Sequence, residues 1–427
     1  MITNTTVDVR LWDISIGKLR WDNEKDLAVF QFSKEYIASK YNLCPVRHRR
    51  NSDGSVRAIP FYGNPGEKYQ GLPEFIADSL PDSWGNTLFD KWMSENNISS
   101  VRSNSLLKLS FMGRRAMGAL EFYPEVYDEN DTEQTPLNIV SLRDLAIKVY
   151  MDRERAVIQD KEKETMKRLI LLGTSAGGKH PKGVVAINKM TGEIRSGQVS
   201  PSKDFRYFII KFKEDLKVPT SEIEMVYHEM AVDAGINMTY CELKEIDGTR
   251  HFMTERFDRV DGKKLFTQTM AAIIPDGNDY MHLFFLCETL NLPYEDKENL
   301  FRRMVFNHVA GVTDDHNKNF SFIMDESGTW RLSPAYDVMF TANIWENGSA
   351  SVHALGLAGK RSHVTFKDLV EFGEDYGIKK PEKIVKEVYA SVSQFRERCH
   401  KYNVDEFWIN RIEMTLKEIH PDYINGK

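Results

Sequence analysis

A short polar segment between two apolar stretches is the chemically most distinctive part of this chain. The segment VAGVTDDHNKNFSF, residues 309–322, holds two adjacent aspartates, one histidine, one lysine and two asparagines in fourteen positions. Carboxylate and amide oxygens suit Mg²⁺, and a carboxylate can accept a hydrogen bond from a hydroxyl nucleophile. The segment therefore indicates a phosphoryl-transfer site, with an ordinary capping or turn aspartate as the alternative.

The elements around this segment bring another acid towards it. Residues 298–311 have helical apolar spacing, and strands are expected at 320–324 and 329–333. A hairpin that runs out and back returns Asp337 to the end where Asn319 begins it. Asp314, Asn319 and Asp337 are therefore predicted to converge.

The spacing of the loop matches the catalytic loop of protein kinases. Asp314 and Asn319 reproduce Asp-x-x-x-x-Asn, whose Asp is the base and whose Asn holds a metal, although HRD is absent and YDV replaces DFG. Asp314 is predicted to orient a hydroxyl, and Asn319 and Asp337 to hold Mg²⁺. No chemical role is assigned to the remaining polar residues Asp315, His316 and Lys318.

A kinase also needs groups that hold a nucleotide, beginning with a cation. The strand FRYFIIKFK, 205–213, places Lys211 in an apolar setting that suits a phosphate-facing role. A solvated strand-end lysine is the alternative. Glu224, on the following predicted helix 221–236, is a candidate partner for Lys211, and a helix-capping role explains this Glu equally well.

Two further segments match the needs of a nucleotide. GTSAGGKHPKG, 173–183, offers small residues and backbone N–H groups for phosphates, or else a flexible connection. CELKEI and HFMTERFDRV are predicted to form a hairpin at 241–260. Glu255 and Phe257 are candidates for a hinge that holds adenine, with an ordinary strand as the alternative.

Length and composition limit the class of protein. A chain of 427 residues is expected to form two or more lobes, and an acid- and proline-rich linker is predicted at 124–136. The net charge of −6 gives no overall attraction to nucleic acid or membrane, which leaves two local basic clusters, 47–50 and 101–120. Four dispersed cysteines and the lack of a signal sequence indicate a reduced, cytoplasmic protein.

Together these segments resemble the HipA family of toxin kinases, the serine/threonine kinases of bacterial HipBA toxin–antitoxin systems. The matching segments are GLPEFIADSLPDSWGNTLFDKW (71–92), TSAGGKHPK (174–182), FIIKF (208–212), TERFDR (254–259), TDDHNKNFSF (313–322), LSPAYDV (332–338) and LGLAGKRS (355–362). The resemblance implies an α+β, two-lobed protein-kinase-like fold that uses ATP and Mg²⁺. The expected parts are an N-terminal subdomain at 1–125, a mixed α/β kinase N-lobe at 140–262 and a mainly helical C-lobe at 263–427.

The resemblance also assigns roles to residues. Asp314 is the catalytic Asp, Asn319 and Asp337 are metal ligands, and Lys211 contacts phosphate. Nucleotide contacts are expected from the phosphate loop and the hinge, namely Ser175, Ala176, Gly177, Gly178, Lys179, Glu255 and Phe257. Family members autophosphorylate a serine of the phosphate loop, which ejects the loop, and the equivalent position here is Thr174 with Ser175 adjacent.

The family also implies partners. Its members phosphorylate a serine in an aminoacyl-tRNA synthetase, typically glutamyl-tRNA synthetase, which stalls translation and promotes persistence. A HipB-type helix-turn-helix antitoxin binds the toxin and operator DNA. One departure is that the Gln-Glu-Asp commonly found after the hinge is Gln268-Thr269-Met270 here, so Gln268 stays a candidate nucleotide contact.

Two other functions remain open from the sequence. Asp-x-His-x-x-Asn also resembles the catalytic loop of phosphoinositide kinases, which makes a small-molecule or lipid kinase the alternative enzyme. A catalytically silent nucleotide-binding component of a DNA-bound complex is the alternative of another class, and it would depend on the basic stretch 101–120.

Overall fold

The chain folds into two compact units. The computed structural model describes residues 6–51, 53–56, 58–99, 104–126, 137–152, 158–175, 177–198, 201–342 and 352–419. The first unit comprises Met1–Glu214, Lys244–Gln268 and Ile323–Thr329, and the second comprises Asp215–Leu243, Thr269–Phe322 and Trp330–Lys427.

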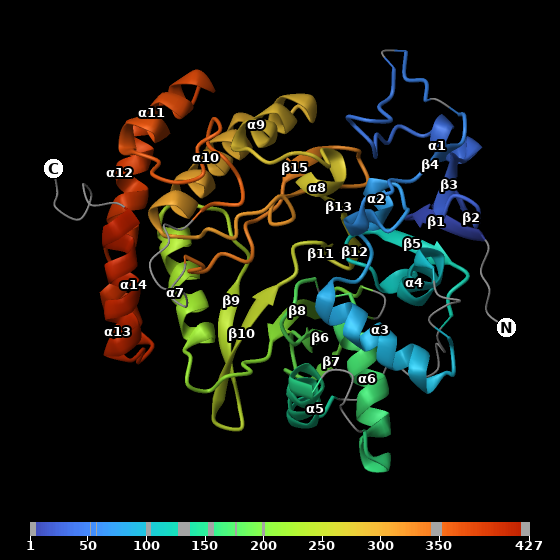
Figure 1. The fold of residues 1–427 in the computed structure, drawn as a ribbon, viewed down its shortest axis with the longest axis horizontal. Helices are drawn as coiled ribbons and strands as arrows, with labels where there is room; N and C mark the ends of the chain where they lie inside the picture. Colours follow the sequence, from blue (N-terminus) through green and yellow to red (C-terminus); the bar gives the residue numbers. More distant parts are fainter. Residues whose placement is uncertain are drawn as a thin grey trace. The chain divides into compact units, whose positions relative to one another are not determined.

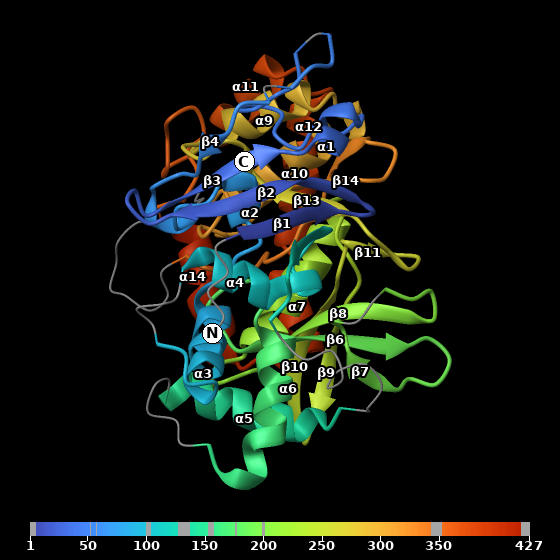
Figure 2. The same cartoon turned by 90° about the vertical axis from the view of Figure 1, so that its right-hand side faces the viewer.

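The first unit begins with an antiparallel sheet of order β4-β3-β2-β1-β5. Its strands are β1 (Thr6–Leu11), β2 (Ile14–Asp22), β3 (Leu27–Phe32), β4 (Phe61–Tyr62) and β5 (Leu120–Tyr123). In β1, Val7, Val9 and Leu11 are fully buried, the period-two pattern of a strand with one face on a core. Helix α4 (Ser105–Met112) packs against β5 and also against β1, beside which it lies in Figure 2. The short helices α1 (Lys34–Ala38) and α2 (Glu74–Ala77) complete this part.

A second sheet has the order β7-β6-β8-β10-β9. Its strands are β6 (Lys182–Asn188), β7 (Ile194–Ser196), β8 (Phe205–Lys211), β9 (Cys241–Ile246) and β10 (Thr249–Glu255). Helix α6 (Lys163–Gly173) packs against β6, α3 (Ser83–Glu95) and α5 (Ile139–Asp152). The predicted lysine strand and the predicted hairpin are thus confirmed as β8 and as β9–β10. The short strands β11 (Arg259–Val260), β12 (Lys263–Lys264) and β13 (Phe266–Thr269) follow.

The second unit is mainly helical. Its helices are α7 (Thr220–Asp233), α8 (Met270–Ile273), α9 (Tyr280–Thr289), α10 (Tyr294–Val309), α11 (Phe366–Asp375), α12 (Pro381–Val392), α13 (Phe395–Lys401) and α14 (Glu406–Ile419). Helix α12 packs against α10, α11 and α7, and α13 packs against α7 (Figure 1). The predicted hairpin after α10 is present as β14 (Ser321–Met324) and β15 (Trp330–Leu332).

Arginines of the two basic clusters hold the first unit together. Arg50 donates hydrogen bonds to four backbone carbonyls within residues 36–54. Arg115 is buried and donates to the carbonyls of Phe111 and Leu171. These guanidinium groups satisfy the unit's own loops and helix ends, so their position in the sequence does not by itself indicate a nucleic-acid surface.

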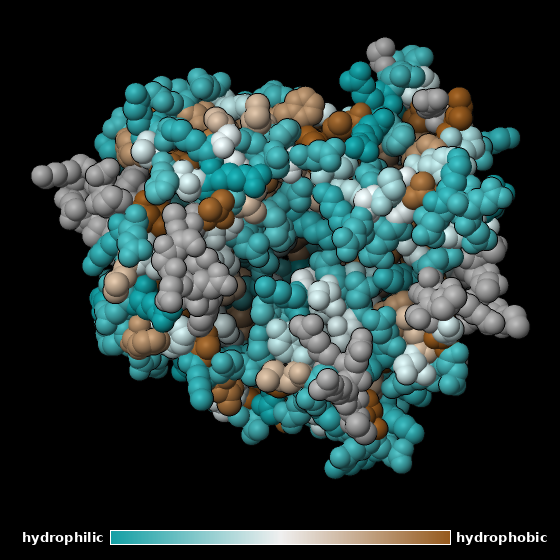
Figure 3. Space-filling view, viewed as in Figure 1, coloured by the Kyte–Doolittle hydropathy of each residue, from teal (hydrophilic) through white to brown (hydrophobic). Residues whose placement is uncertain are grey.

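The exposed side chains are mostly hydrophilic. On the face shown in Figure 3, hydrophobic residues are scattered in small groups among hydrophilic ones. Among the described residues, none of the helices is both long and apolar enough to span a lipid bilayer.

Candidate active site

The loop between α10 and β14 is held by side chains that bind its backbone. Thr341 Oγ1 accepts hydrogen bonds from the backbone N–H groups of Thr313 at 2.8 Å and Asp314 at 2.9 Å. Asn319 Nδ2 donates to the carbonyl of Asp314 at 2.8 Å. The side chain of Asp314 is itself 61% exposed. A fixed backbone therefore presents an accessible carboxylate, the arrangement that a residue orienting a substrate hydroxyl requires.

The neighbouring Asp315 has the opposite environment. Its carboxylate is buried and accepts hydrogen bonds from four donors: Tyr280 Oη at 2.6 Å, His353 Nδ1 at 2.9 Å, Ala354 N at 2.8 Å and Leu355 N at 3.3 Å. Burial, and then the carboxylate of Asp315, raise the pKa of Tyr280 well above its ordinary value, so the phenol stays a donor. Asp315 therefore fastens the loop to α9 and to the segment that follows residue 352.

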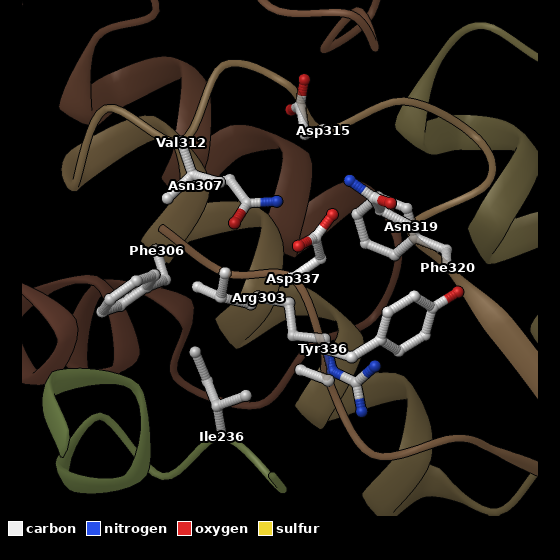
Figure 4. A pocket seen from close by; sticks show the side chains of 12 residues that line it. Ile236, Arg303, Phe306, Asn307, Val312, Asp315, Asn319, Phe320, Tyr336 and Asp337 are labelled. Atoms are coloured by element: carbon white, nitrogen blue, oxygen red, sulfur yellow. The ribbon is translucent and has the colours of Figure 1, made fainter. Parts of the chain in front are cut away.

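Asp337 and Asn319 line one small cavity of about 20 Å³ in the second unit. Figure 4 shows the Asp337 carboxylate pointing between the side chains of Asn319 and Asn307. The backbone of Asp337 has a φ of 55°, a left-handed conformation that non-glycine residues hold at a cost of about 1–3 kcal/mol. The hairpin thus returns Asp337 to Asn319, as its geometry predicted. Asn319 contacts Asp314 through the backbone carbonyl of Asp314, and the aspartate of the loop that lines this cavity is Asp315.

The donor set fits magnesium bound together with a nucleotide. The described residues hold no cluster of three or more His, Cys, Asp or Glu side chains that could coordinate a metal ion without other ligands. One carboxylate from Asp337 and one amide oxygen from Asn319 are a sparse set. Mg²⁺ commonly takes one or two carboxylates and completes its shell with water and substrate phosphates. The pair therefore matches a metal that arrives with ATP.

Further contacts fix the segment that carries Asp337. Tyr336 Oη donates to the carbonyl of Lys318 at 2.7 Å and lies 2.5 Å from Ser321 Oγ. Arg303, buried on α10, donates to the carbonyl of Ser333. Burial lowers the pKa of Arg303 to about 10, so it remains charged at neutral pH. The residues that directly precede Asp337 are thus held in place, while Asp337 itself is exposed.

In the first unit, Lys211 has a second lysine as its direct neighbour. Lys182 on β6 pairs with Lys211 on β8, and Phe252 on β10 pairs with Lys211 from the other side. Residues that pair directly across antiparallel strands share a face, and like charges in such a pair are destabilising. Two adjacent cations are suited to an anionic ligand such as phosphate.

The candidate phosphate loop, residues 173–183, is packed against the rest of the first unit at its two ends. Thr174 is fully buried and its hydroxyl donates to the carbonyl of Ile170, at the end of α6. Ser175 is also buried and accepts a hydrogen bond from Gln198 Nε2. Lys182 Nζ donates to the carbonyl of Gly177. Lys179 is exposed, and Ala176 lies outside the described residues.

The hinge candidates adjoin a buried ion cluster. The carboxylate of Glu255 forms two hydrogen bonds of 2.8 Å with Arg206, so its backbone is the part that suits a base. Asp258 accepts from Arg256, Arg259 and the N–H of Gly118. Burial alone would raise the pKa of Asp258, but the two arginines overcome it and hold this pKa well below its usual range.

Phe257 and Gln268 lie in the same unit. Phe257 is half-buried in the turn that follows β10. Gln268 on β13 is 1% exposed, and within the described chain neither Nε2 nor Oε1 of its side chain has a hydrogen-bond partner. An unmade hydrogen bond at a buried polar group costs about 1–3 kcal/mol, so such a group indicates an absent partner. The surrounding residues cover both atoms, so a nucleotide would reach this amide only after a rearrangement, and the contact between Gln268 and a nucleotide stays a prediction.

Several of these residues gave no signal in the sequence. The donors to Asp315 come from residues 280 and 353–355, and the pairing of Lys182 with Lys211 depends on strand register. The sequence signal for the structural role of Asp315 was its position directly beside Asp314, because one catalytic loop needs a single catalytic aspartate. Lys211 belongs to the first unit and Glu224 to the second, and their pairing stays a prediction.

The fold is protein-kinase-like, and comparisons with known proteins show the family. The HipA N-terminal domain model matches residues 7–123, and the HipA-like C-terminal domain model matches residues 174–395. The latter covers more than half of the chain. The chain therefore belongs to the HipA family.

Two relatives agree with this assignment. The serine/threonine-protein kinase toxin HipA of Shewanella oneidensis is 22% identical over 365 residues, 78% of this chain and 75% of that protein. A solved structure from Shewanella oneidensis MR-1 contains HipA, HipB and their operator DNA. One chain of that structure superposes on this protein with a TM-score of 0.65 at 16% identity, and the match covers 97% of this chain and 95% of the other. The predicted α+β kinase-like fold and the family resemblance are confirmed, and the protein is a HipA-like serine/threonine-protein kinase that uses ATP.

Proposed function

We propose that this protein transfers the γ-phosphoryl group of ATP, with Mg²⁺, to a serine or threonine hydroxyl of a protein, and so arrests translation and growth. The observation that carries the proposal is the pair of aspartates with opposite environments. Asp315 is buried and fastens the loop, whereas Asp314 is exposed on a backbone bound by Thr341 and Asn319.

The chain's own groups have distinct tasks in this reaction. Asp314 accepts a hydrogen bond from the acceptor hydroxyl and orients its oxygen towards the phosphorus. Asn319 and Asp337 would hold Mg²⁺, which neutralises charge on the phosphate oxygens when bound. Lys182 and Lys211 supply positive charge to the nucleotide phosphates. Pre-positioned charges of this kind are the main means by which phosphoryl transfer is accelerated.

The finer features of the family are proposals for this chain. The substrate is an aminoacyl-tRNA synthetase, with glutamyl-tRNA synthetase as the first candidate, and the partner is a HipB-type antitoxin that brings the kinase to operator DNA. The Shewanella protein with the similar fold was solved with HipB and operator DNA. Autophosphorylation falls on Thr174 or Ser175. Both hydroxyls are buried here, so modification requires the loop to leave its present position.

Growth and labelling together test the proposal. Expression of the wild-type chain should arrest bacterial growth and phosphorylate purified glutamyl-tRNA synthetase in vitro, and both effects should disappear in Asp314→Ala. Arrest that disappears in Asp314→Ala but leaves no phosphate on any protein would support a small-molecule or lipid kinase. Arrest that survives Asp314→Ala would support a DNA-bound component without catalysis.

A further inference from the structure

The first turn of helix α3 binds the described part of the phosphate loop. Asp82, directly before α3, accepts a hydrogen bond from the N–H of Gly178 at 3.0 Å through Oδ2. The backbone N–H of Trp84 donates to the carbonyl of Gly178 at 3.1 Å. The first N–H groups of a helix lack partners within the helix, so the loop carbonyl satisfies one of them. Both backbone groups of Gly178 are thus held by the start of α3.

Contacts at the two ends of the loop extend this attachment. A Cβ at Gly85 would lie 2.2 Å from the carbonyl oxygen of Thr174, so helix and loop approach as closely as a glycine permits. The indole Nε1 of the buried Trp84 donates to the carbonyl of Lys182 at 2.9 Å. Gly178 has a φ of +95°, and a Cβ there would meet Lys182 Nζ at 2.6 Å. Helix α3 therefore contacts the loop at its beginning, middle and end.

The carboxylate of Asp82 binds the loop instead of capping the helix that it precedes. Asp82 occupies the N-cap position of α3, yet in the described structure its side chain makes no capping hydrogen bond to that helix. An N-cap aspartate ordinarily accepts from the second or third residue of its helix. Here the carboxylate accepts from Gly178, 96 residues further along the chain. Loss of the carboxylate should therefore affect the loop more than the helix.

We propose that Asp82 is a positioning residue that latches the phosphate loop onto α3 and thereby sets the affinity for the nucleotide. The role of the latch rests on the proposed kinase function, because it acts on the loop that would cover the phosphates. It also gives a role in nucleotide binding to the segment 71–92, which contains none of the candidate nucleotide contacts. The latch lowers the cost of ordering the loop when ATP binds, because the loop is already held.

Two variants and a control test the latch. Asp82→Ala removes the acceptor for Gly178, Asp82→Asn keeps an oxygen acceptor without the charge, and Asp152→Ala removes an exposed aspartate at the end of α5. Amide hydrogen exchange across residues 172–182 reports the loop in full-length protein, whether or not it is active. Fluorescence titration with mant-ATP reports affinity, and KM and kcat for ATP report turnover.

In the Asp82→Ala protein, the amides of residues 172–182 should exchange faster than in the wild type. The affinity for mant-ATP should fall about tenfold and the KM for ATP should rise about tenfold, with a smaller change in kcat. Asp82→Asn should lie closer to the wild type, and Asp152→Ala should match it. Unchanged loop exchange and unchanged mant-ATP affinity in a folded Asp82→Ala protein would overturn the latch. Absence of phosphoryl transfer in every protein, including the wild type, would instead contradict the kinase proposal, while exchange would still decide the latch.

Discussion

Replacing each of the two adjacent aspartates with alanine should separate stability from catalysis. Asp315→Ala removes the acceptor for Tyr280, His353 and two backbone N–H groups in a buried site. Asp314→Ala removes a carboxylate that is 61% exposed and carries no buried donor. Asp315→Ala should therefore lower the stability of the protein, whereas Asp314→Ala should remove phosphoryl transfer from a protein that stays folded.

The magnitudes follow from the environments. Removing one partner of a buried, charge-bearing network costs about 3–5 kcal/mol, because the remaining groups stay desolvated without an acceptor. Total stabilities of domains are about 5–15 kcal/mol, so Asp315→Ala should bring the second unit close to unfolding at 37 °C. A substitution at an exposed position changes the unfolding free energy by about 0.5 kcal/mol or less. Asp314→Ala should lose phosphoryl transfer at nearly unchanged stability.

Urea denaturation with hydrogen exchange read separately in the second unit would measure this contrast, alongside single-turnover transfer from ATP. Asp315→Asn is the matched control, because its amide oxygen keeps an acceptor for some of the donors. An Asp315→Ala protein that unfolds at the wild-type urea concentration would refute the structural role of Asp315. An Asp314→Ala protein that is destabilised by several kcal/mol would refute the exposed, unburdened position of Asp314.

Three further predictions concern the metal, the phosphates and pH. Asp337→Asn should fold normally, because Asn tolerates a positive φ. The variant should need about tenfold more Mg²⁺ for half-maximal phosphoryl transfer. An unchanged Mg²⁺ titration would contradict the role of Asp337 as a metal ligand. Lys211→Met should raise the KM for ATP about tenfold or more. Adding Lys182→Met should raise the KM by less than the two single effects combined, because both lysines would bind the same anion. Fully additive effects would show that the two lysines act on different groups. Burial, and then Arg143 and Lys213, lower the pKa of the fully buried His251 to about 4 from 6.5. Between pH 4 and 6.5 the unfolded chain therefore binds more protons at His251 than the folded chain does. The free energy of unfolding should fall as the pH falls through that range, by no more than about 1.4 kcal/mol per pH unit. His251→Gln keeps an acceptor for the Lys213 N–H and should show a shallower decline in urea midpoint; an identical decline would assign the pH dependence to other groups.

The hairpin geometry around Asp337 could be predicted from the sequence because strand periodicity and a turn determine which residues meet at the open end. The lysine strand was predictable for the same reason. The buried role of Asp315 was not, because its donors lie 35 residues before it and about 38–40 residues after it in the chain. The neighbour of Lys211 depends on the register between β6 and β8, which local sequence does not specify when both strands are apolar.

The task of the N-terminal segment was also hidden from the sequence. Residues 71–92 were recognisable by resemblance, but the hydrogen bond from Gly178 to Asp82 joins positions 96 residues apart. Likewise, Gln268 could be proposed as a nucleotide contact from its place after the hinge, whereas its unpartnered buried amide appears once the fold is known. Long-range contacts of this kind carry the physical argument for the site.

The most direct test of the central claim is the intact and peptide-mapped mass of the purified chain after incubation with ATP and Mg²⁺, with and without glutamyl-tRNA synthetase, beside Asp314→Ala. In the wild-type reaction, added phosphate is expected on a serine or threonine of the synthetase, or on Thr174 or Ser175. None is expected with Asp314→Ala. Equal phosphate with both proteins would contradict the role of Asp314, and no phosphate with either would contradict the proposed protein-kinase activity towards these substrates.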